Sequence, residues 1–147
     1  MKKFNFGLEK VLELRKYRER ETEIALGKAV GELTDIERKI AETAAERERM
    51  AQFIPSGTAD ILAFDRYFLR LDTAKAGFLK KAAQAERAVE EARTVYLEAS
   101  RDRKILDNIK DRRQKEYRKR IFAEETNLLD DISSGVKARK LAEGTEV

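Results

Sequence analysis

Apolar side chains recur at alternating steps of three and four residues along most of the chain. Two series carry this repeat, and they are apolar at eight of thirteen and twelve of fourteen positions. A repeat of 3.5 residues sustained over so many turns predicts long helices packed as a coiled coil, without a globular core. The first seam is Leu8, Leu12, Arg15, Glu19, Thr22, Leu26, Ala29, Leu33, Ile36, Ile40, Thr43, Arg47 and Met50; the second seam is Ile61, Phe64, Phe68, Leu71, Lys75, Phe78, Ala82, Ala85, Val89, Ala92, Tyr96, Ala99, Arg103 and Leu106.

Two places interrupt the helical pattern. The first is residues 54–58, where Pro55 lacks the backbone donor that a continuing helix needs and Gly57 follows it. The second is Ser133-Ser134-Gly135, because glycine is common just after a helix C-terminus. The sequence therefore predicts one helix over residues 5–53, a turn at 54–58 and a second helix over residues 59–134.

A connection of five residues forces the two helices to run antiparallel. The predicted fold is thus all-α: a long two-helix antiparallel coiled-coil hairpin whose second helix is the longer. Residues 1–135 are expected to form this hairpin as a single domain, followed by a flexible tail at 136–147. If the turn is symmetric, residue i lies opposite roughly residue 112 minus i, which pairs Glu9 with Arg103, Glu19 with Arg93, Glu37 with Lys75 and Arg47 with Asp65.

The second helix continues beyond the first, unpaired, for about 27 residues, which is roughly 40 Å of helix. This unpaired segment carries an apolar stripe on one helical face, and such a stripe needs a cover. The cover is another protein or a second copy of this chain, unless the assumed register is wrong. The stripe residues are Tyr117, Ile121, Leu128 and Ile132, with Phe122 and Leu129 beside them.

The amino-acid composition limits which folds and which catalytic or metal-binding groups this chain can have. Charged and apolar residues each make up 41% of the chain, and only seven Gly and one Pro remain for turns, which excludes a sandwich or barrel. Because His, Cys and Trp are absent, there is no imidazole base, thiol nucleophile or Cys/His metal site. We therefore expect no enzyme, no cofactor and no metal. Neither a signal-peptide core nor an apolar run of ~20 residues is present, so we expect a cytoplasmic protein without direct membrane insertion.

Basic residues concentrate at 101–120, a stretch that contains ten basic and four acidic residues. Interspersed acids and a single aromatic argue against a nucleic-acid site, and the stretch lacks the large apolar face of a membrane-surface helix. A solvated helix face would explain the charge; binding to an acidic protein surface is the alternative that we favour. At the other end, core packing accounts for Phe64, Phe68 and Phe78, whereas Tyr67 with Phe53 and Ile54 could anchor a partner at the hairpin tip.

The opening stretch Phe4-Asn-Phe-Gly-Leu-Glu-Lys-Val-Leu-Glu-Leu-Arg resembles the start of the FliJ family of flagellar export proteins, down to the charged run and the alanine-rich segment that follow. Residues 67–71, 106–117 and 129–132 also resemble that family. The resemblance implies an antiparallel hairpin similar to the central stalk of rotary ATPases. It also implies a place at the inner face of the membrane, at the flagellar basal body.

Three partners follow from the same resemblance: the hexameric export ATPase, the cytoplasmic domain of the export gate membrane protein, and the chaperones of export substrates. The open end of the hairpin would enter the ATPase ring and promote its assembly and activity. The ring-facing candidates are Arg112, Arg113, Tyr117, Arg118 and Ile121, and the gate-binding candidates near the tip are Tyr67, Leu71, Ala74 and Phe78. A self-associating coiled-coil scaffold and the central stalk of an injectisome are the alternatives.

Overall fold

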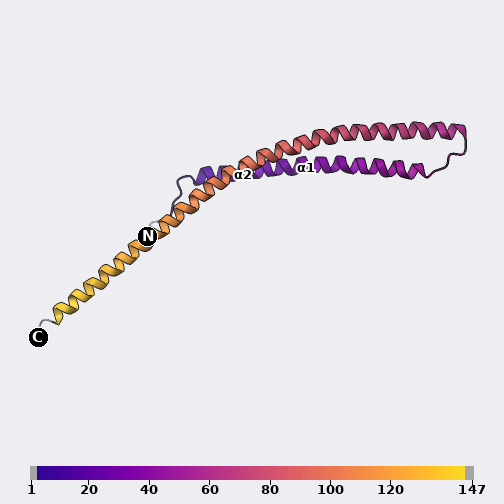
Figure 1. Cartoon of the computed structure of the whole chain (residues 1–147). Helices are drawn as coiled ribbons and strands as arrows, with labels where there is room; N and C mark the ends of the chain where they lie inside the picture. The colour runs from indigo at the N-terminus through magenta and orange to yellow at the C-terminus, as the bar shows by residue number, and fades with distance from the viewer. Residues whose placement is uncertain (1–2, 145–147) are drawn as a thin grey trace. The chain divides into compact units, whose positions relative to one another are not determined.

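The computed structural model describes residues 3–144, which form two helices, α1 (Glu9–Ala51) and α2 (Thr58–Glu143). The two helices pack against each other in antiparallel directions, and α2, with 86 residues, is twice as long as α1, with 43 (Figure 1). Residues 3–144 contain no strand. The predicted fold, an antiparallel coiled-coil hairpin with a longer second helix, is confirmed.

The chain forms two compact units, which are treated separately below. The larger unit comprises residues 14–102, and the smaller comprises residues 1–13 and 103–147. Each unit contains part of α1 and part of α2. The prediction that residues 1–135 form one domain stays a prediction.

In the larger unit the two seams form the contact between the helices. Every first-seam residue from Arg15 to Met50 is at least partly buried except Arg47, and every second-seam residue from Phe64 to Ala99 is at least partly buried. The buried seam residues of the larger unit are Ala82, Val89 and Ala99, and small alanine side chains allow helix axes to approach closely. The predicted 3.5-residue pattern therefore identifies the packed faces correctly.

The link between the helices is residues 52–57, one residue longer than the predicted turn and shifted toward the N-terminus. Gln52 and Phe53 donate backbone hydrogen bonds to Arg49 and Met50, which closes the last turn of α1. The hydroxyl of Ser56 bonds the carboxylate of Asp60 at 3.1 Å, at the start of α2. Pro55 disfavours helical backbone at the residue before it, so α1 ends before Ile54.

The register differs from the predicted one by seven residues. Glu9 pairs with Lys110, where Arg103 was expected, and Arg47 pairs with Asp72, where Asp65 was expected. A seven-residue slip is one full repeat of the seam, so it returns the same faces to each other. The link decides between the two registers: its residues rise along the axis by about 3.3 Å each, against 1.5 Å in a helix, and carry α2 past the end of α1.

The predicted start of the first helix at residue 5 is wrong, because α1 begins at Glu9. Phe6 is buried, and together with Leu12 and Leu106 it forms the hydrophobic core of the smaller unit. A turn closed by the hydrogen bond from the Glu9 amide to the Phe6 carbonyl leads into α1. Burial of the Phe6 ring outweighs the few helical hydrogen bonds that residues 5–8 give up.

The predicted end of the second helix is also wrong. Helix α2 continues through Ser133, Ser134 and Gly135 to Glu143, where a flexible tail was expected; residues 145–147 lie outside the described part. No glycine adopts positive φ in the described part. Gly135 costs the helix about 1 kcal/mol relative to alanine, and the strong helix formers at 137–142 offset this cost.

Candidate functional site

The open end of the hairpin is built from the N-terminal segment and α2; we define it as residues 3–13 with 103–121. The ring of Phe4 lies 5.5 Å from the ring of Tyr117, and the guanidinium of Arg113 lies 5.7 Å from the centre of the Phe6 ring. Farther in, the Lys110 ammonium lies 2.8 Å from the Glu9 carboxylate. The N-terminal segment thus covers one face of α2 as far as Tyr117.

The five candidate ring-facing residues do not share one surface. Tyr117, Arg118 and Ile121 line a shallow depression together with Phe122 and Glu125. Arg112 lines a different depression, and Arg113 packs on Phe6. Because adjacent residues project about 100° apart around a helix, the two arginines leave α2 in different directions.

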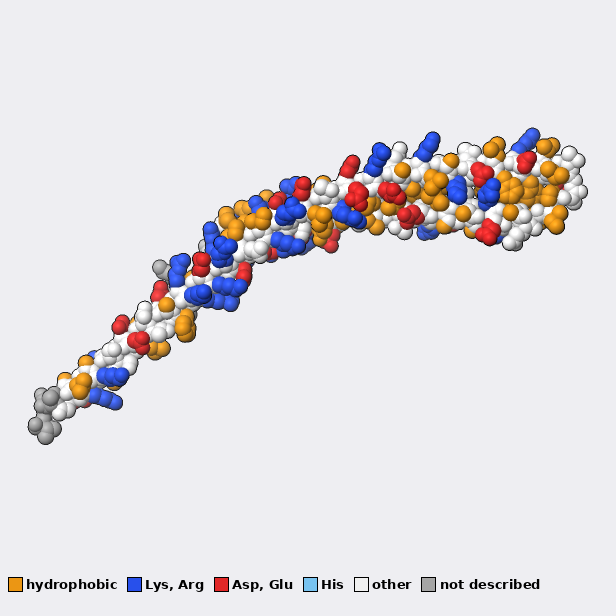
Figure 2. All heavy atoms as spheres, in the orientation of Figure 1, with side chains coloured by type: hydrophobic (Ala, Val, Ile, Leu, Met, Phe, Trp, Pro, Cys, Tyr) orange, Lys and Arg blue, Asp and Glu red, His pale blue; other side chains and the backbone are white. Residues whose placement is uncertain are grey.

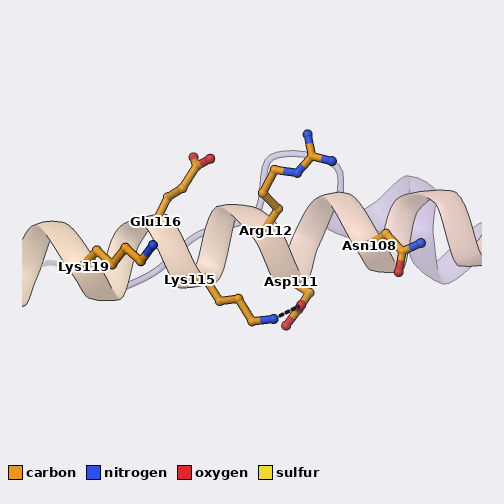
Figure 3. A pocket seen from close by; sticks show the side chains of 6 residues that line it. All are labelled: Asn108, Asp111, Arg112, Lys115, Glu116 and Lys119. Atoms are coloured by element: carbon orange, nitrogen blue, oxygen red, sulfur yellow. Dashed lines mark ion pairs between the residues drawn. The ribbon is translucent and has the colours of Figure 1, made fainter.

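The depression that includes Arg112 is drawn in Figure 3. Its six lining residues, Asn108, Asp111, Arg112, Lys115, Glu116 and Lys119, all belong to α2. Arg112 and Glu116 project on one side of the helix, while Lys115 bonds Asp111 at 2.8 Å on the other. One helix cannot enclose a small molecule, so these exposed charges suit contact with a protein surface.

Intrachain ion pairs neutralise part of the basic charge at 103–121. Lys110 pairs with Glu9, Lys115 with Asp111 and Arg103 with Asp107. Beyond these pairs, the exposed basic side chains at 103–121 are Lys104, Arg112, Arg113, Arg118, Lys119 and Arg120. The open end therefore keeps a cationic surface, visible as blue groups in Figure 2, next to the apolar edge of Tyr117 and Ile121.

The gate-binding candidates lie in the larger unit, and three of the four take part in the contact between α1 and α2. Leu71 and Phe78 are second-seam residues and are half-buried. The Tyr67 hydroxyl donates a 2.8 Å hydrogen bond to Glu46 of α1, and this bond raises the pKa of the Tyr67 phenol above its usual 10.0. Only Ala74 of the four is exposed.

Apolar side chains are exposed around the link. Phe53 and Ile54 of the link are 65% and 87% exposed, and Ile61 and Leu62 of the first turns of α2 are each about half exposed. Phe53 stacks on Phe64 at 5.7 Å, which holds it against α2 without burying it. This cluster, which we call the tip cluster, adds Ile61 and Leu62 to the Phe53 and Ile54 that the sequence placed with Tyr67 at the tip.

Sequence reasoning missed the role of the N-terminal aromatics. Phe4 and Phe6 were assigned to the start of a helix or to a family motif, whereas they cover α2 from Leu106 to Tyr117. Tyr117 was assigned to an uncovered stripe and is in fact half-buried under Phe4. The available signal was a phenylalanine shortly before the first turn of a helix that carries Leu12, similar to a hydrophobic staple.

Residues 3–144 contain no group of acidic residues that could hold a metal ion. Nor does this part of the chain include a helix apolar and long enough to span a membrane. What the fold offers is exposed surface: a cationic, partly apolar open end and an apolar tip cluster. These features define the class of the protein, a two-helix coiled coil equipped for contacts with other proteins.

The chain matches the family model described as flagellar FliJ protein over residues 4–141. It belongs to the FliJ family, whose members are non-enzymatic components of flagellar protein export. No curated protein and no solved structure matches the chain significantly. The resemblance of the opening stretch is thereby confirmed, and the chain is a flagellar export-related protein.

Proposed function

We propose that this protein inserts its open end into the centre of the hexameric flagellar export ATPase and promotes assembly and hydrolysis. The supporting observation is the open end itself, where exposed Arg112 and Arg118 stand beside the partly buried Tyr117 and Ile121. A cationic surface with an apolar edge fits an acidic, partly apolar channel, and its charges would speed docking. Family membership favours a flagellar ATPase over the injectisome one.

We also propose that the tip contacts the cytoplasmic domain of the export gate, so that the hairpin links the ATPase to the membrane at the basal body. The exposed tip cluster and Ala74 support this assignment. Escort of export chaperones is the third part of the proposal, and it rests on family membership alone.

The test is a titration of the full chain into the purified export ATPase, following hydrolysis and hexamer formation together. Arg112 and Arg113 are both exposed. The Arg112→Glu variant is preferred to a change at Arg113, because the Arg113 guanidinium also lies over the Phe6 ring and its reversal would disturb the N-terminal segment. We expect half-maximal stimulation to need about tenfold more of this variant, since an exposed charge reversal at an interface costs on the order of 1 kcal/mol.

The matched control is Arg87→Glu, an equally exposed reversal on α2 in the larger unit. It is expected to stimulate the ATPase as the natural protein does. Equal stimulation by both variants would contradict the assignment of Arg112 to the ring, and no stimulation by the natural protein would contradict the stalk function altogether.

A further inference from the structure

The last part of α2, residues 122–143, which we call the extension, is exposed at every position. Phe122, Leu128, Leu129 and Ile132 are each more than half exposed, and Val136 is 47% exposed. Apolar groups are visible on its surface in Figure 2. A contiguous apolar stripe left exposed along a helix calls for a cover.

The exposed residues form a third seam with the same spacing as the first two. Its positions alternate by four and three residues, as in the first two seams, but they are out of phase with the second seam, whose series would continue at Lys110, Arg113, Tyr117 and Arg120. One flank of this seam carries two large and two small residues in order: Ile121, Leu128, Gly135 and Ala142. The third seam is Arg118, Phe122, Glu125, Leu129, Ile132, Val136, Arg139 and Glu143.

We propose that two copies of this chain pair through their third seams in antiparallel orientation, about a two-fold axis between residues 130 and 131. In this register Ile132 packs on Leu129 of the second copy, twice by symmetry. The ends of the paired region then bring together unlike groups: Arg118 meets Glu143 of the second copy, and Arg139 lies over the Phe122 ring of the second copy. Each of these contacts also occurs twice, as an isologous interface requires.

The order of charges along the third seam favours pairing with a second copy of the chain, and it favours the antiparallel direction. Reversing one helix of the pair brings Arg118 opposite Glu143 of the second copy, and it sets Glu125 opposite Val136, one helical turn from Arg139 of the second copy. Parallel pairing would set each of these charges against its own copy, and like charges in contact are destabilising.

Packing on the flank is also self-complementary in the antiparallel register. Leu128 lies opposite Gly135 of the second copy, and Ile121 lies opposite Ala142, so each large side chain meets a small one. Asp130 and Asp131, nearest the axis, project from the helix about 120° or more away from the seam. The carboxylates of the two copies therefore do not face one another.

Pairing does not depend on the ATPase. Arg118 and Ile121 belong both to this interface and to the open end, so a paired chain would have these two residues covered. The free protein would then be a dimer, and the two copies would separate when the open end binds the ATPase.

Sedimentation equilibrium of the full chain over a range of concentrations tests the pairing, with the 17.0 kDa monomer as reference. The natural protein is expected to show a reversible monomer–dimer equilibrium. Ile132→Asp should raise the dissociation constant at least ~tenfold, because it buries a charge at the centre of the apolar contact. The control Ser134→Asp adds the same charge on the opposite side of the helix and should leave the constant unchanged.

A natural protein that stays monomeric at every concentration would overturn the proposal. So would an Ile132→Asp variant that dimerises as tightly as Ser134→Asp. Circular dichroism of both variants shows whether the hairpin itself remains helical.

Spin labelling tests the direction, and it is straightforward because the chain has no cysteine. With a single label at Lys119→Cys, antiparallel pairing separates the two labels by roughly 35 Å along the axis. Parallel pairing would bring them to about 10 Å, the spacing of packed helices. A short distance would contradict the antiparallel interface.

Discussion

Adjacent residues of α2 have different environments because a helix separates them by about 100°. Arg112 and Arg113 are both exposed, but the Arg113 guanidinium also lies over the Phe6 ring and helps to hold the N-terminal segment. Tyr117 and Arg118 differ in the same way, since the tyrosine contacts Phe4 and the arginine is exposed. A charge count over 101–120 cannot separate structural cations from those free to bind a partner.

At the residue scale, the Tyr67–Glu46 pair gives a prediction for pH. The hydrogen bond to the Glu46 carboxylate raises the pKa of Tyr67 in the folded state. The bond therefore stabilises the helix pair fully below the phenol's unfolded pKa, and this stabilisation is lost as pH rises through the higher folded pKa. Glu46→Gln removes the negative charge, so the pKa of Tyr67 should fall toward 10.0.

NMR titration of the tyrosine ring signals measures this change, with Glu42→Gln as the control, because Glu42 does not bond Tyr67. An unchanged Tyr67 pKa in the Glu46→Gln variant would show that the carboxylate is not the cause.

At the element scale, short irregular segments decide how the long helices end and pair. The link at 52–57 sets the register one heptad away from the symmetric one. The N-terminal segment before α1 supplies Phe4 and Phe6, which extend the covered part of α2 to Tyr117. The two seams alone are compatible with either register of the helix pair and with either start of the first helix, at residue 5 or at Glu9.

Phe6→Ala tests the anchoring of the N-terminal segment. Phe6 is 4% exposed and packs in the core cluster with Leu12 and Leu106, so its removal should destabilise the smaller unit by about 3 kcal/mol. Chemical denaturation measures this loss, and proteolysis should become faster at the N-terminal segment. Leu8→Ala, at a position already 36% exposed, is expected to change the stability by less than about 1 kcal/mol. Equal losses in the two variants would show that Phe6 is not the anchor.

At the scale of the whole molecule, the proposed binding surfaces lie far apart in the sequence and in different compact units. The ring candidates belong to the smaller unit and the gate candidates to the larger one. Substitutions on one surface should therefore leave the other function intact, as additivity of distant sites requires.

Ala74→Glu tests this separation. Ala74 is the exposed member of the gate candidates, so the added charge should weaken gate binding at least ~tenfold without disturbing the helix pair. Stimulation of the ATPase should persist. Ala76→Glu, exposed on the other side of α2, is the control; if it weakens gate binding as much as Ala74→Glu, the gate surface has been placed on the wrong face.

The sequence by itself determined the fold class, the two packed faces and the family. The heptad spacing of Leu33, Ile36 and Ile40, or of Val89 and Ala99, predicts burial because helical periodicity is a local property. Pro55 predicts the link for the same reason, since its effect on the backbone does not depend on distant residues.

Only the tertiary structure decided the register, the burial of Phe6 and the length of α2. A seven-residue repeat is satisfied equally by registers one heptad apart, so the choice depends on the path of the link. Whether Phe6 continues a helix or folds onto α2 depends on the distant Leu106. The candidate site was therefore predicted in its residue types, while contacts between distant residues decided which of them, such as Arg112 and Ala74, are exposed to bind a partner.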